Sequence, residues 1–213
     1  MKRSQSNDDL KRLGNPTKIV LLGEACIGKS TLFHKINEFT SPNYKFLKTY
    51  QTTDNFDFNR IELATNQGIV TVDLWDTAGQ ESRGGNIRDA YLKGADGVLL
   101  LYDVTKRDTI EHMPKWLTQI KKIAPTIPVA VIGNKAENID KLQQYESIKI
   151  RDTTIEKDLG HKIFKNFLIS IKEDIHVESV SGYFSSKTIE IPGCLIGLEY
   201  ILTNIFKQSI TIN

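Results

Sequence analysis

The segment Gly23–Ser30 limits what this chain can fold into more than any other stretch. It follows the apolar run 19–22 and precedes residues 31–39, whose apolar side chains recur at helical spacing. It matches the pattern G-x-x-x-x-G-K-[ST], in which backbone N–H groups surround phosphate oxygens between a strand and a helix. We therefore predict a phosphate-binding loop in which Lys29 reaches the terminal phosphates and Ser30 ligates Mg²⁺.

The composition describes an ordinary water-soluble protein. The 213 residues are 39% hydrophobic and 25% charged, with a formal net charge of +2. So small a charge argues against nucleic-acid binding driven by bulk electrostatics, and we expect no nucleic-acid partner. The two cysteines, Cys26 and Cys194, lack metal-ligand spacing, which favours a reducing compartment.

Targeting patterns point to the same compartment. No secretory signal or membrane-spanning segment is visible, and residues 208–213 contain no cysteine for prenylation. We therefore expect an intracellular, cytoplasmic monomer without a direct lipid anchor, with the nucleus as an alternative location.

The order of these patterns predicts one domain with additions. Residues 1–16 are polar and without periodicity, which is typical of a flexible N-terminal arm. The domain is expected over 17–207, with an insertion around 138–180 and a short tail over 208–213.

A second group of polar residues follows the apolar run 69–75. Asp76 directly after this strand is where a nucleotide-bound Mg²⁺ needs a carboxylate. Gly79 lets its backbone N–H approach the terminal phosphate, and the Gln80 amide can hold a water in line for attack.

These motifs, together with the threonines near 53 and Gly133-Asn134-Lys135, resemble the ordered motifs of the Ras superfamily of small GTPases. The resemblance implies an α/β fold, the P-loop GTPase fold, with a six-stranded, mostly parallel sheet and helices on both faces. It further implies that GTP or GDP binds with Mg²⁺ at the carboxyl ends of the strands. The implied protein partners are effectors, an exchange factor and a GTPase-activating protein.

Two branches of the superfamily fit the chain. Gly84-Gly85 with Arg88-Asp89, and then Asp103-Val104-Thr105, are similar to Ran, whereas residues 91–105 are also similar to Rab. The absence of a cysteine-containing tail favours a Ran-like interpretation.

The first switch is expected in the loop that precedes Phe56. Aligning Phe56-Asp57-Phe58 with the family's following strand assigns the Mg²⁺-sensing role to Thr53, with Thr52 as the alternative. Such a hydroxyl orders the loop only when the third phosphate is present.

Asn134-Lys135-Ala136-Glu137 resembles the family's base-reading motif, in which the last residue is aspartate. The resemblance implies that Asn134 bonds the purine edge and that the Lys135 stem lies along the base. Glu137 retains the carboxylate that accepts from guanine N–H donors, but its longer side chain must fold back. We expect guanine to be bound, with relaxed base selection as the alternative.

The family's final motif, Ser-Ala-Lys, has two matches. Ser185-Ser186-Lys187 lies at the expected distance from the last helix and is favoured over Ser170-Ile171-Lys172. In this motif the middle backbone N–H contacts the guanine oxygen.

Together, these motifs and the resemblance assign three groups of site residues. The expected nucleotide contacts are Gly23, Glu24, Ala25, Cys26, Ile27, Gly28, Lys29, Ser30, Thr31, Thr53, Gly79, Asn134, Lys135, Glu137, Ser185, Ser186 and Lys187. The metal ligands are Ser30, Thr53 and Asp76, and the catalytic residues are Gln80 and Lys29.

The expected activity is a GTP/GDP switch that hydrolyses GTP slowly, in Ran- or Rab-like intracellular transport. Turnover should be slow because no arginine is recognisably placed to act in cis and because Ala25 replaces a glycine found in Ras. Two alternatives remain open: a guanine-nucleotide-dependent binding module without turnover, and an ATP-using enzyme with a phosphate-binding loop.

Overall fold

The computed structural model describes residues 12–41, 44, 56–77, 89–138, 164–173, 175–180, 183–187 and 192–213. Within these residues a single sheet of eight strands has the order β2-β3-β1-β4-β5-β6-β7-β8. The strands are β1 (Arg12–Leu22), β2 (Phe56–Thr65), β3 (Gly68–Thr77), β4 (Gly97–Asp103), β5 (Val129–Asn134), β6 (Phe164–Ser170), β7 (Ile175–Val180) and β8 (Tyr183–Lys187).

The centre of the sheet is parallel. β1 pairs in parallel with β3 and β4, β4 with β5, and β5 with β6, whereas β2, β7 and β8 pair antiparallel with their neighbours. Strands β4 and β5 are buried along their whole length because helices cover both faces, which explains their continuous apolar sequences.

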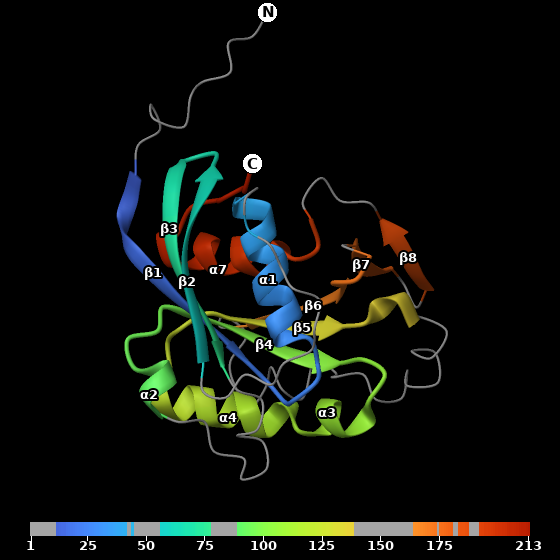
Figure 1. Cartoon of the computed structure of the whole chain (residues 1–213). Coiled ribbons are helices and arrows are strands. Elements are labelled where there is room, and N and C mark those ends of the chain that lie inside the picture. Colours follow the sequence, from blue (N-terminus) through green and yellow to red (C-terminus); the bar gives the residue numbers. More distant parts are fainter. Residues whose placement is uncertain are drawn as a thin grey trace, which may run out of the picture.

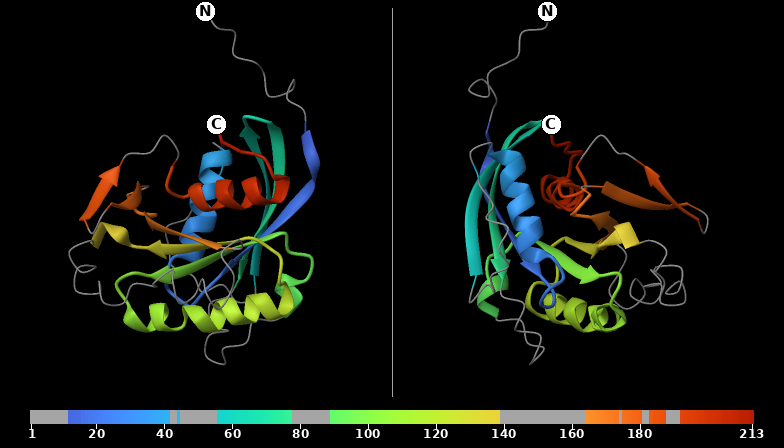
Figure 2. Two further views of the ribbon diagram at one scale, coloured as in Figure 1. Left: turned by 180° about the vertical axis from the view of Figure 1, so that it is seen from behind. Right: turned by 45° about the vertical axis from the view of Figure 1, so that its right-hand side comes forward.

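Helices form a layer on each face of the sheet (Figures 1 and 2). They are α1 (Lys29–Thr40), α2 (Asp89–Leu92), α3 (Arg107–Glu111), α4 (Met113–Ile123), the short 3₁₀ helix η3 (Ala136–Asn138) and α7 (Ile196–Phe206). Figure 1 shows α1 and α7 on one face and α2, α3 and α4 on the other. No described helix is long and apolar enough to cross a membrane.

Each layer buries an apolar stripe at helical spacing. Leu32, Phe33 and Ile36 of α1 join α7 in one core cluster, and Trp116 and Ile120 of α4 belong to the cluster on the opposite face. These two cores fix the helices against the sheet and so position the loops at the strand ends.

The expected six-stranded, mostly parallel sheet is confirmed, and two further strands extend it. Residues 164–170, which the sequence analysis included in the insertion, form β6 and pair in parallel with β5. The hairpin β7–β8 is the described addition, and residues 139–163 lie outside the described residues.

Both ends of the described domain differ from the expected boundaries. β1 begins at Arg12, inside the predicted arm, and residues 1–11 lie outside the described residues. At the other end, Ile210 and Ile212 are buried in the core, and Ile212 forms a bridge with Thr65 at the end of β2. The predicted tail therefore packs against the domain.

One half-buried histidine makes fold stability depend on pH. His34 of α1 contacts the Tyr44 hydroxyl through its Nδ1 atom. Burial lowers the pKa of His34, although the carboxylates of Asp57 and Glu38 oppose the shift. The unfolded chain therefore takes up this proton at a higher pH than the folded chain.

We expect the melting temperature of the wild-type chain to fall between about pH 7 and pH 5 because protonating His34 favours unfolding. His34→Gln should flatten this dependence, as thermal unfolding followed by circular dichroism would measure. Tyr44→Phe is the matched control and should leave it unchanged, because burial is the largest cause of the shift. If the melting temperature of His34→Gln falls with pH as steeply as that of the wild-type chain, the pH dependence does not come from His34.

Candidate nucleotide site

Polar residues gather where the central strands end. Gly23 follows β1, Asp76 lies near the end of β3, Asp103 ends β4 and Asn134 ends β5. Because β1, β3, β4 and β5 are parallel, these residues come to the same edge of the sheet. Open α/β sheets bind ligands outside this edge.

The phosphate loop turns sharply between β1 and α1. Gly23, Cys26 and Gly28 all have positive φ angles, of 129°, 62° and 105°. A Cβ atom on Gly23 would lie 2.4 Å from the Leu101 carbonyl oxygen, so only glycine fits there. The sharp turn ends at the N-terminus of α1, an arrangement suited to anions.

Lys29 lies inside this loop. Its side chain is 6% exposed, and its Nζ atom donates to the carbonyl oxygens of Gly23, at 3.0 Å, and Glu24, at 2.6 Å. Of the other predicted loop residues, Ile27 is buried in the core, whereas Ala25, Cys26 and Thr31 are exposed.

The predicted metal ligands Ser30 and Asp76 lie on neighbouring elements. Asp76 is fully buried and pairs in register with Leu21 of β1, just before the loop. The described residues contain no group of three or more histidine, cysteine, aspartate or glutamate side chains arranged for a metal. A hydroxyl and a carboxylate fit Mg²⁺, which takes oxygen ligands and few protein side chains when phosphates and waters complete its shell.

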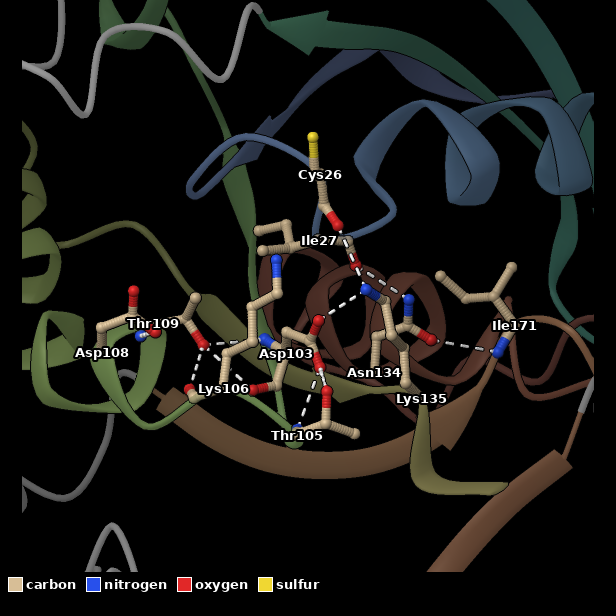
Figure 3. A network of polar contacts seen from close by, with 10 residues as sticks. All are labelled: Cys26, Ile27, Asp103, Thr105, Lys106, Asp108, Thr109, Asn134, Lys135 and Ile171. Carbon is tan, nitrogen blue, oxygen red and sulfur yellow. Dashed lines mark hydrogen bonds and ion pairs between the residues drawn. The ribbon is translucent and has the colours of Figure 1, made fainter. Parts of the chain in front are cut away.

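Asn134 joins the phosphate loop to the segment that follows β6 (Figure 3). Its side chain is buried, its Nδ2 atom donates to the Ile27 carbonyl oxygen at 2.9 Å, and its Oδ1 atom accepts from the Ile171 N–H at 3.2 Å. A Cβ atom on Gly28 would lie 2.4 Å from Asn134 Nδ2. Gly28 therefore makes room for this contact.

Lys135 adopts a positive φ of 69° and reaches back to the same loop. Its Nζ atom donates to the Cys26 carbonyl oxygen at 3.1 Å and pairs with the carboxylate of Asp103 (Figure 3). Burial alone would raise the pKa of Asp103, but hydrogen bonds from Lys135 and Thr105 outweigh it and lower that pKa. The Asp103 carboxylate therefore stays ionised at neutral pH.

Glu137 lies in η3, directly after these two residues. Its Oε2 atom is buried and accepts no hydrogen bond from the described residues. A buried acceptor without a donor is costly, which suits a site where a ligand supplies N–H groups.

The structure brings Ile171, rather than Ser186, to Asn134. The favoured match Ser185-Ser186-Lys187 lies on β8, which β7 separates from β6. Ser170 is buried at the end of β6, and its Oγ atom accepts from the Glu173 N–H at 3.0 Å. Ser170-Ile171-Lys172, the alternative match, is therefore the segment that lies beside Asn134.

Three predicted site residues, Thr53, Gly79 and Gln80, lie outside the described residues, as does the alternative Thr52. Conversely, Asp103 and Thr105 lie beside these residues, although neither was among the predicted site residues. The pattern that could have identified them is the one that predicted Asp76 and Asn134, namely polar residues at the end of a buried strand.

An exposed aromatic surface lies on β2 and β3. Phe56 and Phe58 are 45% and 46% exposed, and their ring centroids lie 4.8 Å and 5.3 Å from that of Trp75. Lys18 Nζ lies 4.6 Å from the Trp75 ring centroid. Exposed aromatic clusters of this kind are typical of protein contact sites.

Comparisons with known proteins identify the family that the chain resembles. The model of the Ras family matches residues 18–186. The chain is 36% identical over 127 residues to Ras-related protein RABA4b of Arabidopsis thaliana, a match covering 58% of this chain and 53% of that protein. It is 35% identical over 127 residues to Ras-related protein Rab11A of Lotus japonicus, with the same two shares.

These matches span about half the length of the curated relatives. The names of these relatives are of the Rab type, so the comparisons do not support the Ran branch that the sequence analysis favoured. They agree instead with the Rab-like features of residues 91–105.

We expect Gly28→Ala to weaken nucleotide binding at least about tenfold. The positive φ alone costs an alanine about 1–2 kcal/mol, and its Cβ atom would displace the Asn134 amide. Titration with a fluorescent GDP would measure the loss. Gly94→Ala is the matched control, because Gly94 also has positive φ but meets no atom within 4 Å. Equal affinities of the two variants would contradict the role of Gly28.

Proposed function

Because the chain belongs to the Ras family, we propose that it is a molecular switch that binds GTP or GDP with Mg²⁺ and hydrolyses GTP slowly. The main support is the Asn134 side chain, which bonds the Ile27 carbonyl oxygen and so joins the phosphate loop to the base-reading segment. On this proposal, the ligand contacts both segments, with phosphate at the loop and a base at Asn134.

On this proposal the phosphate side of the site supplies charge and orientation. Lys29 exchanges its carbonyl partners for phosphate oxygens, and Ser30 and Asp76 hold Mg²⁺, directly or through water. The metal neutralises charge that develops on the phosphates. Thr53, or Thr52, senses the third phosphate, and Gln80 orients the attacking water.

The base side of the site selects guanine. Glu137 offers a buried carboxylate oxygen that accepts no hydrogen bond from the described residues. Guanine presents two N–H donors to such an acceptor, whereas adenine would leave the carboxylate without a donor. The backbone N–H of Ile171, which donates to Asn134 Oδ1 in this structure, is the proposed donor to the guanine oxygen and would exchange or share its acceptor when the base binds.

The aromatic surface and the Rab-type relatives together support a proposal for the protein partners. Phe56, Phe58 and Trp75 form an apolar contact area for effector proteins that distinguish the two nucleotide states. Together with the Rab-type relatives, this surface supports a role in intracellular transport.

We expect GTP and GDP to displace a fluorescent GDP at least about 100-fold better than ATP does, and Mg²⁺ to strengthen binding. Equilibrium competition measures both effects. Glu137→Ala should lose the preference for guanine, and the matched control Glu137→Asp should keep it. Equal competition by ATP would instead support an ATP-using enzyme.

We expect Gln80→Leu to lower GTP turnover at least about tenfold without weakening GDP binding, because leucine cannot orient a water. Phosphate release under single-turnover conditions measures this. Turnover unchanged by the substitution would contradict the role of Gln80. Tight GDP binding with no turnover in the wild-type chain, even with activating proteins, would support the binding-module alternative, which Ala25 and Glu137 favour.

A further inference from the structure

A fully buried acid, Asp103, lies at the end of β4 and belongs to none of the proposed nucleotide contacts. Both of its carboxylate oxygens have partners. Oδ1 accepts from the N–H of Thr105 at 2.9 Å and from its hydroxyl at 2.6 Å, and Oδ2 pairs with the Nζ atom of Lys135. The carboxylate therefore has a fixed orientation.

The backbone of Asp103 is fixed as well. The buried Thr109 hydroxyl accepts from the Asp103 N–H at 3.1 Å and lies 3.0 Å from its carbonyl oxygen. The next residue, Val104, donates its N–H to the Asn134 carbonyl oxygen at 3.1 Å. The end of β4 is thus tied to the segment that contains Asn134 and Lys135 (Figure 3).

Lys135 connects this acid to the phosphate loop. Its ammonium group contacts both Asp103 and the Cys26 carbonyl oxygen. A lysine side chain loses about 1.5–2 kcal/mol of rotamer freedom when it is fixed, so a single exposed carbonyl would hold it poorly. A buried carboxylate at hydrogen-bond distance supplies the missing attraction.

We propose that Asp103 is a positioning residue for nucleotide retention. It holds the Lys135 ammonium group against the Cys26 carbonyl oxygen, so that the lysine stem and the phosphate loop keep the geometry that a bound nucleotide needs. That the retained ligand is a guanine nucleotide rests on the proposed function.

The test measures dissociation of a fluorescent GDP from the wild-type chain, Asp103→Asn, Lys135→Met and the double variant. Methionine keeps an apolar stem of similar length and removes the ammonium group. We expect Asp103→Asn to accelerate dissociation roughly tenfold in the wild-type background and to have no further effect in the Lys135→Met background. A purely structural role would accelerate dissociation equally in both backgrounds and would overturn the proposal.

Thr105→Val is the matched control, because it removes one hydrogen bond to Asp103 but keeps the pair with Lys135. It should change the dissociation rate less than about twofold. If Asp103→Asn does not fold, Asp103→Glu keeps the charge and displaces it by one methylene. The same cycle with Lys135→Met then applies, and equal effects in both backgrounds again overturn the proposal.

The two proposals fail in different ways. Wild-type protein that binds no guanine nucleotide would overturn the proposed function, and this inference with it. Wild-type protein that binds GDP tightly, with a dissociation rate that Asp103→Asn leaves unchanged, would overturn this inference alone.

Discussion

The hydrogen bond between Asn134 Nδ2 and the Ile27 carbonyl oxygen is the contact on which the rest of the site depends. It joins two segments that are 107 residues apart in the sequence. It forms only because Gly28, with no side chain and a positive φ, leaves room for the amide. On the other side the same amide accepts from the Ile171 N–H, so one buried side chain at the end of β5 contacts both the phosphate loop and the segment after β6.

That contact in turn depends on how the sheet is buried. Asn134 and Asp103 are paired residues in the register of β5 and β4, and both strands are buried along their full length. A shift of one residue would exchange their apolar side chains between two cores of different shape, which close packing makes costly. The core therefore fixes the register, and the register places the polar ends of the strands side by side. The positions of Asp103 and Asn134 at this edge therefore depend on how the core of the sheet packs.

The parts of the site that the sequence predicted share one signal, a polar motif directly after a buried strand. This signal located Lys29, Asp76 and Asn134 at the correct edge of the sheet. Ser185-Ser186-Lys187, the favoured match for the final motif, lies away from Asn134, because the β7–β8 hairpin lengthens the connection to the last helix and distance from that helix does not account for it. The pair between Asp103 and Lys135 could not be predicted, because it depends on the pairing of β4 with β5.

Both site lysines donate to carbonyl oxygens of the phosphate loop, but their surroundings differ. Lys29 contacts the carbonyl oxygens of Gly23 and Glu24, and phosphate oxygens are stronger acceptors, so its ammonium group can exchange partners when nucleotide arrives. Lys135 pairs with the buried carboxylate of Asp103. If the Lys135 ammonium group moved away, this carboxylate would be left buried and unpaired, which is costly, so Lys135 keeps its position. Lys29 is therefore suited to respond to the ligand, and Lys135 is suited to keep the phosphate loop in place while Lys29 changes partners.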